Sequence, residues 1–116
     1  MNFLEQISAK TRERVARDSG IMTLADIERR VAQRPLPPAF AETLRKPGLR
    51  IIAEIKRASP SEGPLAPDLD PARTAADYAA AGAAAISVLT EPQFFSGDLS
   101  HLLAASAASK LPCLMK

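Results

Sequence analysis

The chain has 116 residues, of which 47% are hydrophobic and 24% are charged, and its formal net charge is +2. This balance is typical of a globular domain that buries a core. Because the sequence has neither an apolar run near the roughly 18 residues that span a bilayer nor the apolar segment of a secretory signal at its start, we expect a cytoplasmic protein without a membrane partner.

Composition also argues against nucleic-acid binders and disulfide-stabilised domains. Acidic and basic residues alternate between positions 10 and 18, which is typical of a solvated helix face. With no Trp and one Tyr, the chain has few aromatic side chains on which bases stack. The single cysteine, Cys113, has no partner for an intrachain disulfide, which fits a reducing compartment.

Residues 1–48 predict a helical amino-terminal extension. Apolar residues recur at helical spacing between positions 3 and 15, which favours a first helix. Thr23, followed three residues later by Asp26, resembles a capping box that starts a second helix. Several prolines end that helix, and a short helical segment is expected at 39–45.

Residues 49–116 predict alternating strands and helices. In chain order we expect a strand at 49–56, a helix capped by Asp70, a strand at 83–89, a helix capped by Ser96 or Asp98, and a strand at 111–115. This order favours right-handed crossovers and a parallel sheet covered by helices. The segment 57–70 is expected to be a loop without secondary structure, of a length often found in functional lids. Since three strands do not close a barrel, we expect the chain to be truncated at Lys116.

Charged residues mark the ends of the predicted strands. Residues two apart on a strand point to the same side, so Glu54 and Lys56 share a face with Ile52, opposite the aliphatic face. Lys116 ends the third predicted strand much as Lys56 nearly ends the first. Barrel enzymes place catalytic groups at this end, so we expect the three charges to converge there. The alternative interpretation is a structural salt bridge or an exposed edge strand.

Three segments resemble a known family. Residues 52–61, IAEIKRASPS, resemble the first-strand signature of indole-3-glycerol phosphate synthases. Residues 82–91, GAAAISVLTE, with Phe94–Gly97 are similar to their second strand and its loop, and 111–116, LPCLMK, to their third strand. The resemblance covers the whole chain. It implies a partial (β/α)8 TIM barrel, with 1–48 as an added helical extension and 49–116 as strands one to three.

The resemblance also implies a reaction and its residues. The implied enzyme is a carboxy-lyase of tryptophan biosynthesis that closes the indole ring of 1-(2-carboxyphenylamino)-1-deoxyribulose 5-phosphate with loss of carbon dioxide and water, without an organic cofactor or metal. Lys116 matches the general acid that protonates the substrate carbonyl. Lys56 matches a lysine that contacts the substrate carboxylate and assists dehydration, and Glu54 a carboxylate that positions both amines. The implied substrate-binding residues are Arg57, Ser59 and Phe95, the last packing against the anthranilate ring.

Other functions stay open at this point. In the family, later strands supply a second glutamate, an asparagine and the phosphate site, so we expect the chain alone to be inactive. A second hypothesis is a non-catalytic half-barrel that self-associates, or pairs with another chain, through the open edge of its third strand. A third is another phosphate-binding barrel enzyme, such as phosphoribosylanthranilate isomerase, which is not expected to share the string Glu54–Arg57.

Overall fold

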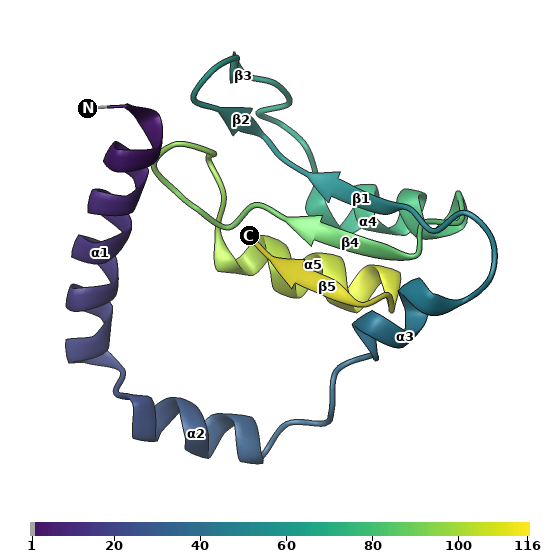
Figure 1. The fold of residues 1–116 in the computed structure, drawn as a ribbon, viewed down its shortest axis with the longest axis horizontal. Coiled ribbons are helices and arrows are strands. Elements are labelled where there is room, and N and C mark those ends of the chain that lie inside the picture. Colours follow the sequence, from purple (N-terminus) through teal and green to yellow (C-terminus); the bar gives the residue numbers. More distant parts are fainter. Residues whose placement is uncertain (1) are drawn as a thin grey trace. The chain divides into compact units, whose positions relative to one another are not determined.

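A computed structural model describes residues 2–116 (Figure 1). The chain forms two compact units, divided between Leu36 and Pro37. The first unit holds α1 (Phe3–Ile21) and α2 (Leu24–Ala32). Within the described residues, none of the helices combines the length and the apolar character needed to cross a membrane.

Both helices of the first unit begin at a capping box. The Thr23 side chain accepts the Asp26 backbone N–H, and the Asp26 carboxylate accepts the Thr23 N–H, as the sequence predicts. Asn2 and Glu5 make the same reciprocal pair at the start of α1. These contacts satisfy backbone donors that would otherwise lack partners in the first turn of each helix.

The second unit contains a parallel sheet and the helices that cover one of its faces. Its elements are α3 (Phe40–Arg45), β1 (Ile52–Ile55), β2 (Ala58–Ser59), β3 (Gly63–Pro64), α4 (Pro71–Ala80), β4 (Ala85–Val88), α5 (Leu99–Ser109) and β5 (Cys113–Met115). Strands β1, β4 and β5 lie in that order and run parallel, with α4 and α5 on one side (Figure 1). This confirms the predicted parallel α/β sheet with helices on one face.

The core lies between the sheet and the two long helices of this unit. Ile55, Ile86 and Val88 from the strands pack against Ala75 of α4 and Ala105 of α5, and all five are at most 1% exposed. Small alanine side chains let the helices approach the sheet closely, so the larger strand side chains fill the interface. The face predicted to be aliphatic is therefore the face that the helices cover.

Helix α5 resolves the choice between the two capping residues. Its N-cap is Asp98, whose carboxylate accepts the Ser100 N–H at 2.8 Å, whereas Ser96 has a left-handed backbone with φ 52°. Helix α4 begins as predicted, with Asp70 as its cap and Pro71 in the first turn. The strands are shorter than predicted; the first, for example, begins to pair with β4 only at Ile52.

The expectation that 57–70 lacks secondary structure is wrong. Strands β2 and β3 pair as a short antiparallel hairpin, with Ser59 opposite Gly63. Two local features close its turn: Gly63 takes a left-handed φ of 68°, and the Ser59 hydroxyl accepts the Glu62 N–H at 3.2 Å. A serine that binds nearby backbone and a glycine with positive φ are typical turn chemistry, so the segment folds locally despite its prolines.

Candidate active site

Strand register places the predicted site residues on the uncovered face of the sheet. Glu54 of β1 pairs with Ser87 of β4, which pairs in turn with Leu114 of β5. Paired residues in a parallel sheet point to the same side, and Lys116, two positions after Leu114, follows the same alternation. Glu54, Ser87 and Lys116 therefore project away from α4 and α5.

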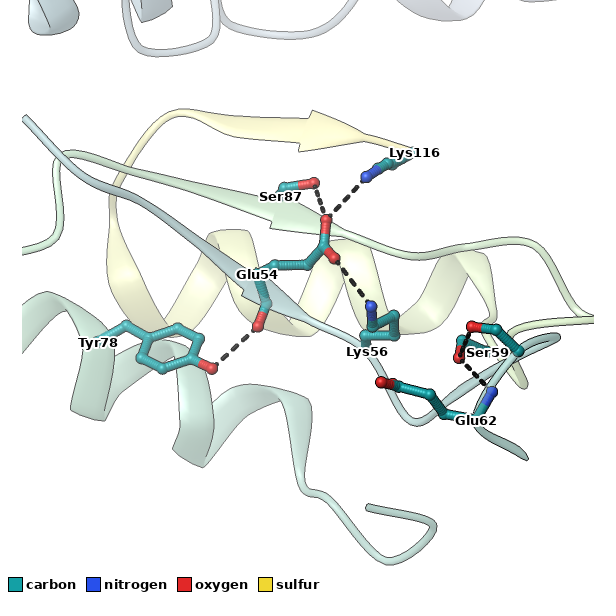
Figure 2. A network of polar contacts seen from close by, with 8 residues as sticks. Glu54, Lys56, Ser59, Glu62, Tyr78, Ser87 and Lys116 are labelled. Atoms are coloured by element: carbon teal, nitrogen blue, oxygen red, sulfur yellow. Dashed lines mark hydrogen bonds and ion pairs between the residues drawn. The ribbon is translucent and has the colours of Figure 1, made fainter. Parts of the chain in front are cut away.

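The Glu54 carboxylate is the centre of this group (Figure 2). Its Oε2 accepts hydrogen bonds from Lys116 Nζ and from the Ser87 hydroxyl, both at 3.1 Å. The Lys56 Nζ lies 3.7 Å from Oε1. The structure thus brings together the carboxylate of β1 and the two amines that directly follow β1 and β5, as the strand pattern predicts.

The Glu54 carboxylate is held in its charged form. Partial burial raises its pKa, but hydrogen bonds from Lys116 and Ser87, with the charges of both lysines, outweigh burial and hold the pKa below its usual value. The Glu54, Lys56 and Lys116 side chains are 31%, 33% and 57% exposed, so the cluster is open to a small molecule. An anchored carboxylate beside two accessible amines suits proton donation to, and charge stabilisation of, an oxygen of a ligand.

Hydrogen bonds fix the backbone at two residues of this cluster, Glu54 and Lys116. The Tyr78 hydroxyl of α4 donates to the Glu54 carbonyl oxygen at 2.9 Å. The Thr90 N–H and hydroxyl both donate to the Lys116 carbonyl oxygen, at 2.8 and 3.0 Å. The Lys116 N–H donates to the Val88 carbonyl oxygen at 3.0 Å. The backbones that carry the carboxylate and one amine are therefore fixed by the elements next to them.

The first loop engages Arg57 and Ser59 in its own folding. The Arg57 guanidinium donates twice to the Leu69 carbonyl oxygen, at 3.1 and 2.6 Å, which ties the start of the loop to its end. Ser59 is 7% exposed, and besides binding the Glu62 N–H its hydroxyl lies 3.3 Å from that of Ser61. Figure 2 shows Ser59 beyond Lys56, on the segment that follows β1.

The second loop holds Phe95 through its backbone. Phe95 is half-buried, and its N–H donates to Glu91 Oε2 at 3.2 Å. Within residues 2–116, no group of three or more His, Cys, Asp or Glu side chains is placed to hold a metal ion.

Sequence reasoning missed two residues that organise the site, Ser87 and Glu91. The period-two alternation of the second predicted strand places Ser87 between two apolar neighbours, which marks it as a polar group on the less apolar face of that strand. Glu91 gives no such signal, because its role depends on a turn that folds back on its own carboxylate.

Fold and site together define a class of protein. A parallel sheet covered by helices on one face, with a carboxylate and two amines gathered near the carboxyl ends of its strands on the other, is the arrangement of (β/α)8-barrel enzymes. The family model for indole-3-glycerol phosphate synthase matches residues 4–116. The chain therefore belongs to the indole-3-glycerol phosphate synthase family, which excludes the isomerase alternative.

Individual relatives agree with this assignment. The chain is 44% identical over 113 residues to the indole-3-glycerol phosphate synthase of Mycolicibacterium gilvum, covering 97% of this chain and 42% of the relative. It is 43% identical over 116 residues to that of Lacticaseibacillus paracasei, covering 98% and 45%. The synthase of Saccharopolyspora erythraea is 44% identical over 116 residues, covering 100% and 43%. The chain thus spans less than half the length of these curated relatives.

Proposed function

We propose that the chain supplies acid–base residues of an indole-3-glycerol phosphate synthase, a carboxy-lyase of tryptophan biosynthesis. The substrate would be 1-(2-carboxyphenylamino)-1-deoxyribulose 5-phosphate, and the products indole-3-glycerol phosphate, carbon dioxide and water. The observation that carries this proposal is the contact of the Glu54 carboxylate with both Lys116 and Lys56 on the open face of the sheet.

Lys116 is the proposed general acid for ring closure. As the aromatic ring carbon bonds to the substrate carbonyl carbon, negative charge grows on the carbonyl oxygen, and the Lys116 ammonium supplies a proton to it. Carbon dioxide then leaves from the ring carbon, and elimination of the new hydroxyl as water completes the indole. Lys56 binds the substrate carboxylate and assists that elimination, and Glu54 orients both amines.

Substrate contacts are proposed for both loops. Phe95 would pack against the anthranilate ring, and Arg57 and Ser59 would act as parts of the hairpin loop that their hydrogen bonds hold together. We propose that the reaction needs no organic cofactor or metal, since an ammonium provides both proton and charge. We also propose a cytoplasmic location, with 1–48 as a helical extension and 49–116 as the first part of the barrel.

A chimaera tests this proposal. Residues 1–116 would replace the matching amino-terminal region of the Mycolicibacterium gilvum synthase, with which they share 44% identity. We expect the chimaera to form indole-3-glycerol phosphate, measured by its absorbance and by release of carbon dioxide, whereas the 116-residue chain alone should show no substantial turnover. A chimaera that melts cooperatively yet forms no product would contradict the proposal.

Pairing through β5 is a second candidate function. Among the described residues β5 is an edge strand, and its Leu114 and Met115 are 46% and 61% exposed. An edge with apolar side chains is a template for pairing with another chain. We expect the 116-residue chain to form dimers at high concentration in light scattering, and Leu114→Glu to abolish them. A compact, cooperatively melting monomer at all concentrations would contradict this alternative.

A further inference from the structure

The segment after β4 folds around the side chain of Glu91. Glu91 is 9% exposed, and its carboxylate accepts three backbone N–H groups, those of Gln93 at 3.1 Å, Phe94 at 2.6 Å and Phe95 at 3.2 Å. The Glu91 carbonyl oxygen accepts a fourth, from Gly97 at 2.9 Å. Because one side chain accepts the backbone N–H groups of three successive residues, it fixes the path of the backbone at both phenylalanines.

The end of the same loop is packed against its own beginning, just after β4. A Cβ atom at Gly97 would lie 2.8 Å from the carbonyl carbons of Leu89 and Thr90. Ser96 takes a left-handed φ of 52° so that the chain can return to this point. The loop is therefore closed at both ends, by the Glu91 carboxylate and by the contact at Gly97.

The loop is also joined to the candidate active site. Thr90, the residue before Glu91, donates both its N–H and its hydroxyl to the Lys116 carbonyl oxygen. Two successive residues thus have separate tasks: Thr90 fixes the backbone of the proposed acid, and Glu91 fixes the backbone of the proposed aromatic contact. Hydrogen bonds therefore fix the backbones of both Lys116 and Phe95 to two adjacent residues of the same segment.

We propose that Glu91 is a positioning residue of this enzyme, which orients Phe95 toward the aromatic ring of the substrate by binding the backbone of residues 93–95. This inference rests on the proposed function. Glu91 does not touch the reacting atoms, so its loss should weaken substrate binding more than it slows the chemical step.

The test compares Glu91→Gln and Glu91→Ala with a matched charge control, Glu28→Gln, in the chimaeric synthase that carries residues 1–116. Glu28 is an exposed residue of α2. The amide of Gln retains one acceptor oxygen, whereas Ala retains none. We expect KM for the substrate to rise severalfold in Glu91→Gln and roughly tenfold or more in Glu91→Ala, with kcat changed less than threefold and the control unchanged.

Amide hydrogen exchange supplies a readout that does not depend on turnover. The N–H groups of residues 93–95 should exchange slowly in the parent protein and much faster in both Glu91 variants. An unchanged KM would overturn the inference. A fall in kcat at constant KM would also overturn it, because loss of folded enzyme gives that result. If Glu91→Ala does not fold, Glu91→Gln decides. Absence of synthase activity in the parent protein would contradict the proposed function. Unchanged amide exchange in Glu91→Gln would separately contradict the proposed role of Glu91 in the loop.

Discussion

The Lys116 ammonium lies 3.1 Å from Oε2 of Glu54, a residue 62 positions earlier in the chain. The two come from opposite edges of the described sheet, and β4 between them contributes the Ser87 hydroxyl to the same oxygen. The carboxylate therefore joins all three parallel strands.

Lys116→Met should remove the proposed general acid while retaining most of the side-chain volume. In the chimaeric synthase we expect kcat to fall roughly 10²–10⁴-fold, the usual contribution of a positioned acid or base. KM should change far less, because the substrate keeps its other contacts. The control is Lys46→Met, at an exposed lysine after α3. The measurement is the initial rate of product formation in the parent and both variants. Undiminished turnover in the Lys116 variant would exclude Lys116 as the acid.

Much of this cluster could be predicted from the sequence, because strand alternation is a local property. Glu54 and Lys56 share a face by their spacing alone, and Lys116 ends a segment of similar pattern. Ser87 completes the cluster only through the register between β1 and β4, which depends on packing between residues distant in sequence. The hairpin in the first loop was missed for a related reason, since its turn depends on the left-handed conformation of Gly63.

Glu54→Gln should reveal the charge of this carboxylate through the pH dependence of stability. The pKa of Glu54 is held below the ordinary glutamate value of about 4.5 in the folded protein, so the ionised group stabilises the fold at pH values above about 4.5. That contribution should be lost as the pH falls through the lower, folded-state pKa. In urea unfolding, the difference in free energy of unfolding between parent and variant should be constant from pH 7 to pH 5 and shrink below pH 4.5. A difference that does not vary with pH would show that Glu54 is not stabilised as an anion.

Ser87→Ala should loosen the same carboxylate from the side of the central strand. The Ser87 hydroxyl is one of the groups that lower the pKa of Glu54, so its removal should raise that pKa. The acidic limb of the kcat profile should then move to higher pH, because protonation of Glu54 releases the amines it orients. Ser87 is 5% exposed, and loss of its hydrogen bond should cost about 1 kcal/mol in unfolding free energy. A pH profile that coincides with the parent profile would contradict this role for the hydroxyl.

Gly97→Ala tests whether the loop after β4 depends on close backbone contact. The added methyl group would lie 2.8 Å from the carbonyl carbons of Leu89 and Thr90, and because these atoms belong to the backbone they can yield only by displacing the segment that directly follows β4. We expect a loss of about 1–3 kcal/mol in unfolding free energy, the usual cost of overpacking. Gly20→Ala is the matched control, since its Cβ meets nothing within 4 Å and the residue lies within α1. That control should be neutral or should stabilise the chain by up to about 1 kcal/mol, because alanine favours helix over glycine. Equal stability of the two variants in urea unfolding would mean that the loop moves aside without cost, and it would remove the contact at Gly97 as a constraint on the position of Phe95.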